Sequence, residues 1–238
     1  MTFTMTPTEH QELPLGSSVP FKELYPVFAG SMVQTYSNIA EDAFAGFLDQ
    51  TDGSTTTGGW RLNERRKAYG IQTIVFSAMA IEAAAFEFMH LIMIDQKAMD
   101  QEEKRGLVHK WKTLPRLLGG QPLDPEGPAI QGLSHLVKAR NSLVHYKAKL
   151  ENDEGSVRIA MQDEWEQFEI HQVPNAFKTL VLLSLELEAS PSGIVGGFPY
   201  HDRAICPPGF KSLYTPHPAV TEVINRCYLI HREHQRGL

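Results

Sequence analysis

Apolar side chains recur at intervals of three and four residues along most of the chain, and this spacing is typical of amphipathic helices. The pattern predicts helices over residues 21–50, 62–97, 100–118, 129–150, 174–188 and 218–235. Residues 156–161 fit a short strand instead. We therefore expect an all-α protein in which four or five principal helices form a bundle.

Proline and glycine divide the chain into three parts. Residues 1–20 are rich in Thr, Pro, Gly and Ser and are expected to form a loose segment, while residues 21–189 form the helical domain. Residues 190–238 combine an irregular Pro/Gly-rich arm with a terminal helix, which either caps the bundle or exchanges onto a partner subunit. Pro115 is expected to kink or split the helix over 100–118, because proline interrupts helical hydrogen bonding.

The charge of the chain is unevenly distributed. A net charge of -6 and a pI of about 5.9 give no general attraction to nucleic acid. Residues 61–149, however, hold 14 Lys/Arg against 9 Asp/Glu, whereas residues 151–169 hold one Lys/Arg against 7 Asp/Glu. Either the middle of the chain is a basic RNA-facing surface beside an acidic stretch, or both are ordinary solvated faces.

Several classes of protein are disfavoured. The chain has only two cysteines, too few for a disulfide framework or a zinc site, and reduced thiols suit the cytoplasm. Its first residues show neither the basic nor the apolar segment of a signal peptide. The most apolar stretch, residues 74–94, contains two glutamates and a histidine, which favours a core helix over a membrane span. These features predict a cytoplasmic protein that does not bind membranes.

The segment from Lys138 to Lys147 carries the most informative chemistry. Arg140, Asn141 and His145 stand within six residues of one another in a predicted helix. A guanidinium stabilises phosphoryl charge, and an imidazole transfers protons near neutral pH. Together these groups are the minimum set for cleaving RNA without a metal.

A straight helix does not bring this set together. Arg140 and His145 are five residues apart, which separates them by roughly 140° around the helix axis. Arg140 also shares a stripe with apolar Leu136 and Val144, where a charge needs a partner, a cleft or a subunit interface. Three arrangements could bring Arg140 and His145 together. The arginine side chain could fold back, the helix could be distorted, or a second copy of the helix could complete the site. We expect dimerisation through residues 133–148.

The string from Ala139 to Tyr146 resembles the signature of the HEPN superfamily, in which Arg is followed by a polar residue, three variable residues and His. The resemblance covers roughly residues 21–150 in architecture and is sharp over residues 139–146. It implies an all-α homodimer with both motif copies at the subunit interface. Many HEPN proteins are metal-independent endoribonucleases that act as toxins, antiphage effectors or RNA-processing enzymes, and others are inactive binding or scaffold modules.

The resemblance also implies a role for each motif residue. His145 acts as general base on the ribose 2′-hydroxyl or as general acid on the 5′-oxygen. Arg140 neutralises charge that develops on the phosphorane, and Asn141 orients the histidine or holds a non-bridging oxygen. The product carries a 2′,3′-cyclic phosphate, and DNA, which lacks the 2′-hydroxyl, is not cut.

Other residues are expected to support this site. Glu82 resembles an acidic position of some HEPN members, and the alternative is an ion pair with Arg140. Tyr146 is a further supporting candidate. Some toxin members carry a Tyr two residues after the His, where a partner nucleotidyltransferase modifies it. Lys147 stands there instead, which puts that regulation in doubt and leaves a regulatory partner open.

Basic side chains provide candidate contacts to RNA. The expected contacts are Lys138, Lys147, Arg65 and Arg66. A further basic cluster spans residues 104–116 and is either a phosphate-binding surface or a solvated helix face.

The competing hypothesis is a non-catalytic, dimeric binding or scaffold module, in which Arg140 and His145 hold the dimer together. The acidic net charge and the long appendage after residue 150 favour it. His231 and His234 have a spacing that suits metal binding on a helix, but no Asp or Cys partner stands at a fixed offset. We therefore expect neither a metal nor a cofactor.

Overall fold

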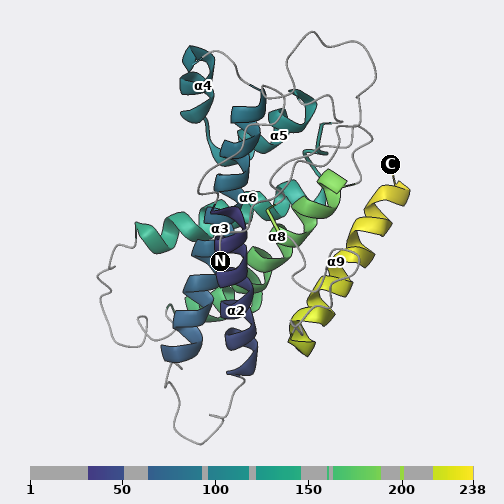
Figure 1. The fold of residues 1–238 in the computed structure, drawn as a ribbon. Helices are drawn as coiled ribbons and strands as arrows, with labels where there is room; N and C mark the ends of the chain where they lie inside the picture. Colours follow the sequence, from purple (N-terminus) through teal and green to yellow (C-terminus); the bar gives the residue numbers. More distant parts are fainter. Residues whose placement is uncertain are drawn as a thin grey trace, which may run out of the picture.

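The computed structural model describes residues 32–50, 64–92, 96–117, 122–145, 160, 163–188, 199–200 and 217–237. Within these residues the protein is all-α, as predicted, and it contains no strand (Figure 1). The elements are α2 (Val33–Asp49), α3 (Glu64–Ile92), α4 (Gln96–Glu103), α5 (Leu107–Leu117), α6 (Pro128–Val144), the π-helix η1 (Gln167–Gln172), α8 (Val173–Glu188) and α9 (Pro218–Gly237).

The helix predicted over 100–118 is divided differently from expectation. The break between α4 and α5 lies at residues 104–106, and Pro115 stands inside α5. Gly106 has a low helix propensity and marks the break. Pro115 cannot donate a hydrogen bond to the carbonyl of Trp111, and α5 ends two residues later.

Two other segments of the structure also differ from the sequence prediction. The motif helix ends at Val144 rather than near residue 150, and residues 146–150 lie outside the described ranges. The predicted strand over 156–161 also lies outside them, except for Ala160, which is helical. The predicted loose segment 1–20 lies outside the described ranges, and so does the predicted irregular arm over 190–218, except for residues 199–200 and 217–218.

Helix α8 is the centre of the bundle. It contacts α2, α3, α6, α9 and η1, and most of its residues from Ala176 to Leu187 are buried. Phe177 is completely buried and stacks on Phe44, with 4.7 Å between ring centroids. Phe177 and Tyr200 also make an edge-to-face contact, with 5.6 Å between ring centroids.

Tyr200 fixes one point of the C-terminal arm to the core. Its hydroxyl donates to Glu41 Oε2 at 2.8 Å, and its backbone amide donates to Ser184 Oγ at 2.9 Å. Tyr200 is only 7% exposed. The arm that was predicted from Pro and Gly content alone is therefore anchored between α2 and α8 at this residue.

The π-helix leads directly into α8, so the helical stretch begins before the predicted start at Pro174. The wider π-turn comes immediately before this proline, whose missing amide proton interrupts an ordinary α-helical ladder. Phe168 of η1 packs against α3 at Gly70, where an added Cβ would lie 2.7 Å from the Phe168 ring. Glycine thus allows the close approach of these two elements.

The motif helix α6 lies close against α8. The side-chain amide of Asn175 donates to the carbonyl of Gly132 at 2.9 Å. A Cβ at Gly132 would lie 2.5 Å from Thr179 Oγ1, so only glycine permits this separation. Contacts of α6 with α3 and α5 complete its support.

Helix α3 supplies a second large part of the core. By length and composition alone, its stretch Glu64–His90 is long and apolar enough to cross a membrane, and 56% of its most apolar window is buried. In this bundle Ile74, Ile81 and Phe88 are at most 1% exposed and pack among neighbouring helices. Packing inside the bundle therefore accounts for the apolar character of α3.

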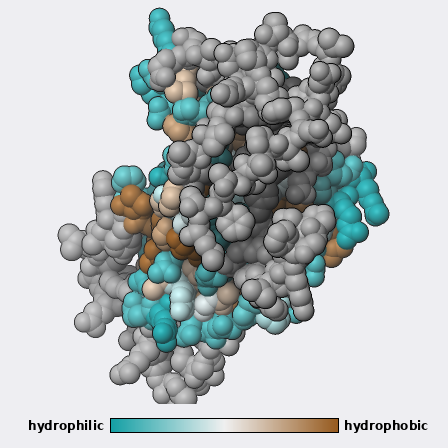
Figure 2. Space-filling model, viewed as in Figure 1, coloured by the Kyte–Doolittle hydropathy of each residue, from teal (hydrophilic) through white to brown (hydrophobic). Residues whose placement is uncertain are grey.

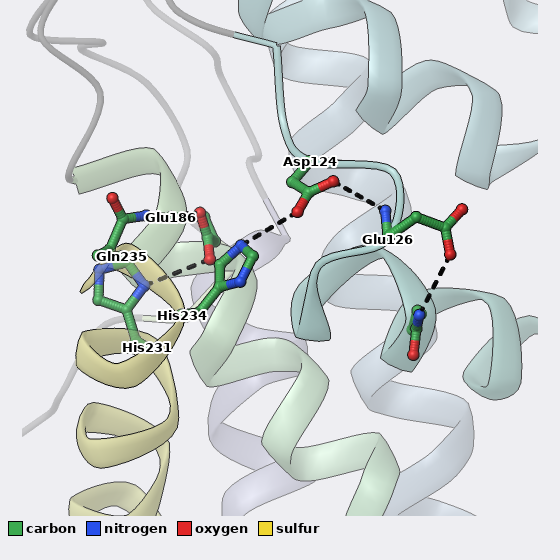
Figure 3. Close-up of polar contacts among 7 residues, drawn as sticks. Asp124, Glu126, Glu186, His231, His234 and Gln235 are labelled. Atoms are coloured by element: carbon green, nitrogen blue, oxygen red, sulfur yellow. Dashed lines mark hydrogen bonds and ion pairs between the residues drawn. The ribbon is translucent and has the colours of Figure 1, made fainter. Parts of the chain in front are cut away.

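Helix α9 packs against α2, α6 and α8. Histidine side chains of α9 also contact carboxylates elsewhere in the bundle. His231 Nδ1 lies 3.3 Å from Glu186 Oε1 of α8. His234 Nε2 lies 3.4 Å from Asp124 Oδ2, in the segment before α6. Figure 3 shows both imidazoles pointing from α9 toward these carboxylates. At the other end of the helix, His217 lies 2.8 Å from Asp49.

Cys227 provides a test of α9 docking. Its thiol faces the bundle, 4.0 Å from the carbonyl of Lys178, and burial raises its pKa from 9.0 to about 12. Only the thiolate reacts, so at pH 8 about 10⁻⁴ of the docked thiol is reactive. In a Cys206→Ser variant we expect labelling by a disulfide reagent at least a hundredfold slower than in urea-unfolded protein. Equal labelling rates would show that α9 is not held on the bundle.

Candidate active site

The motif lies in the last turn of α6 and in the residue that caps it. The helix begins with Pro128 at its first position and ends at Val144. The backbone amide of His145 donates to the carbonyl of Asn141 at 2.9 Å and closes the final turn. This end of α6, residues 140–145, projects from the bundle at the left of Figure 1. The fold therefore places the predicted catalytic residues at the surface.

Arg140 reaches across to α3. Its Nη2 lies 3.5 Å from Glu82 Oε2, so the alternative of an Arg140–Glu82 ion pair matches the geometry. The pair is not buried, because the arginine side chain is 29% exposed and the glutamate side chain 53%. Both charged groups remain accessible to a ligand.

Asn141 and His145 are also exposed. Among the described residues, no hydrogen bond or ion pair joins the side chains of Arg140, Asn141 and His145. Helix α6 is regular through Val144, and Arg140 extends toward Glu82 instead of folding back to His145. Within one chain, the structure shows neither a folded-back Arg140 nor a distorted α6, so the three motif side chains do not converge.

Two exposed apolar side chains follow the ion-pair residues along their helices. Phe86, one turn after Glu82 on α3, is 43% exposed, and Val144, one turn after Arg140 on α6, is 58% exposed. Figure 2 shows hydrophobic side chains gathered on the surface near the projecting end of α6. An apolar surface beside charged groups is typical of a protein interaction site.

The remaining predicted residues are placed as follows. Lys138 on α6 and Arg65 on α3 are exposed. Tyr146 and Lys147 lie outside the described residues.

Arg66 is engaged inside the protein. Its Nε lies 2.7 Å from Glu169 Oε1, and its Nη1 donates to the carbonyl of Phe47 at 2.7 Å. Its guanidinium also lies over the Phe47 ring, 3.9 Å from the centroid. The side chain is 18% exposed. Arg66 therefore joins α2, α3 and η1, and its guanidinium is occupied by contacts within the protein.

The histidines of α9 form a second group of titratable residues. Sequence spacing alone did not reveal their carboxylate partners, Glu186 and Asp124, because these residues are distant along the chain. In the described parts of the chain, no cluster of three or more His, Cys, Asp or Glu is arranged to hold a metal ion. The contacts with Glu186 and Asp124 indicate that His231 and His234 help to dock α9 on the bundle.

The Arg140–Glu82 pair is expected to contribute little to stability. Exposed ion pairs are worth at most about 1 kcal/mol, because water screens them and both side chains lose freedom. Glu82→Gln should therefore change the free energy of unfolding by less than about 1 kcal/mol in urea titration. A loss of several kcal/mol would mean that the pair is a structural element of the fold.

Comparison with known proteins identifies no relative of this chain. No family model, no curated protein and no solved structure matches the chain. The features of this chain that bear on its function are therefore the motif residues, their exposure and the surface around them.

Proposed function

We propose that this protein is a metal-independent endoribonuclease of the HEPN type, which acts as a homodimer through the projecting end of α6. The observation that supports this most is the exposure of Arg140, Asn141 and His145 together at one helix end. Charged and polar groups for phosphoryl chemistry stand there beside exposed apolar side chains. Neither feature is needed to complete the core of a single chain.

In the proposed dimer, the two-fold axis passes near the motif ends of both α6 helices. Val144 and Phe86 supply the apolar contact that covers these surfaces. Two-fold symmetry places each motif against the same residues of the other copy. Groups that diverge on one helix are thereby brought to a common groove.

The chemistry is transesterification of the RNA backbone. One His145 removes the proton of a 2′-hydroxyl, and the resulting oxygen attacks the adjacent phosphorus. The bond to the 5′-oxygen breaks, and the His145 of the second copy donates a proton to that leaving group. Arg140 stabilises the charge on the phosphorane, and Asn141 holds a non-bridging oxygen. The products carry a 2′,3′-cyclic phosphate and a 5′-hydroxyl.

Glu82 acts as a positioning residue in this scheme. Its carboxylate holds the Arg140 guanidinium at 3.5 Å in the single chain, and solvent reaches both groups. A phosphate that enters the groove competes for the same guanidinium, and charge-assisted contacts to phosphate are strong. The pair thus keeps Arg140 extended before RNA binds.

The competing function is a non-catalytic dimeric module, which the Arg140–Glu82 pair itself favours, because the guanidinium already has a partner. The two functions differ in a direct test. The purified protein should cut single-stranded RNA in EDTA if it is the enzyme. A scaffold should leave the RNA intact, and Arg140→Ala should then alter only its oligomeric mass.

The biological role that we propose is that of a toxin or antiphage effector. It is supported only by the resemblance of the motif to the HEPN signature. Expression of the wild-type chain in bacteria should then inhibit growth, and His145→Ala should relieve the inhibition. Equal toxicity of the two proteins would remove the support for this role.

A further inference from the structure

We propose that exposed basic side chains on α5 and α6 bind the phosphate backbone of single-stranded RNA and guide it toward the motif end of α6. The inference rests on the proposed function for the identity of the polyanion. Its starting point is a difference in charge: neither α5 nor α6 contains an Asp or a Glu, although the protein as a whole is acidic.

The two helices, 11 and 17 residues long, hold five Lys/Arg. The rest of the chain holds 17 Lys/Arg against all 28 Asp/Glu. A polyanion is therefore repelled by the chain on average and attracted by these two helices. The distribution of charge thus favours the approach of a polyanion to α5 and α6.

On α5, Lys112 and Arg116 form the exposed part of this surface. They are four residues apart and share a helix face. Neither makes an ion pair in the described part of the chain, so both remain available for phosphates. Lys110 is 6% exposed and does not contribute, and Arg105 pairs with Glu102 at 3.1 Å.

Lys138 is the exposed basic residue of α6 that precedes the motif. Helix α5 contacts α6, and Lys138 is exposed on α6 without an ion pair among the described residues. It stands seven residues, or two turns, before His145, so the two lie on the same face about 10 Å apart. In the proposal, phosphates bound by Lys112 and Arg116 on α5 and by Lys138 on α6 bring the following nucleotides to the motif.

The test measures RNA affinity by fluorescence anisotropy. The probe is a 20-nucleotide single-stranded RNA, and the protein is the full chain carrying His145→Ala so that the probe stays intact. Adding Lys112→Gln and Arg116→Gln should weaken binding about tenfold at moderate salt. Loss of two phosphate contacts should also reduce the slope of log affinity against log salt by about 1.4.

The matched control carries Arg226→Gln and Arg236→Gln, which remove two exposed charges from α9. It should keep the parent affinity within twofold and the parent salt slope. Equal weakening by the two pairs, or an unchanged affinity for the α5 pair, would overturn the proposed surface. Absence of RNA binding by the parent would overturn it as well. Circular dichroism of each variant confirms that the fold is retained.

Cleavage is measured separately, with wild-type protein in EDTA. Intact RNA in that assay would count against the ribonuclease proposal, whereas anisotropy still reports on the α5 and α6 surface. Conversely, cleavage with unchanged affinity in the α5 variant would retain the enzyme and reject the guiding surface. The two failures are therefore distinguishable.

Discussion

His145→Ala is expected to lower the rate of RNA cleavage at least about a hundredfold, because it removes the general acid and base from both copies of the site. Arg140→Ala should cause a loss of similar size, because no other group of the motif stabilises charge on the phosphorane. Gel analysis of a labelled single-stranded RNA in EDTA measures both rates. Both replaced side chains are solvent-accessible, so the variants should fold normally.

Matched substitutions separate catalysis from a general effect of lost charge. His171 is another exposed histidine, on η1, and Arg226 is another exposed arginine, on α9. His171→Ala and Arg226→Ala should retain the wild-type rate within twofold. Wild-type rates in the two motif variants would contradict the proposed site, even if the protein cleaves RNA by other residues.

Phe177→Ala is expected to have the largest effect on stability, a loss of about 3–5 kcal/mol in the free energy of unfolding. The Phe177 ring is fully buried and contacts the rings of both Phe44 and Tyr200. Removing it leaves a cavity at the centre of α8 that the neighbouring helices cannot fill. Urea titration followed by circular dichroism measures the change.

Leu229→Ala is the control for this prediction. Leu229 lies on α9 and is 52% exposed, so its truncation should change the free energy of unfolding by less than about 0.5 kcal/mol. A small loss for Phe177→Ala, similar to that of the control, would show that α8 is not the centre of the core.

Local sequence patterns were sufficient to predict most helices. The apolar run of α8 and the amphipathic spacing of α9 predicted these helices to within a few residues, because each must bury a particular face. The all-α class followed from the same periodicity. The position of the motif on a helix was also predictable, since residues 133–144 keep a regular apolar spacing.

The features that sequence missed depend on contacts between distant residues. Tyr200 meets Glu41 across 159 positions, and Arg66 meets Glu169 across 103. No local pattern identifies such partners, so Arg66 resembled an RNA contact. Likewise, the exposure of Arg140 depends on how far α6 extends beyond its neighbours, which periodicity does not specify.

The central claim is that the projecting end of α6 forms a ribonuclease site that uses the 2′-hydroxyl. The most direct test is product analysis after incubating wild-type protein in EDTA with a labelled single-stranded RNA and a DNA of the same sequence. We predict RNA fragments that end in a 2′,3′-cyclic phosphate, and intact DNA. Intact RNA, cleavage of the DNA, or RNA fragments with 3′-hydroxyl ends would contradict the account.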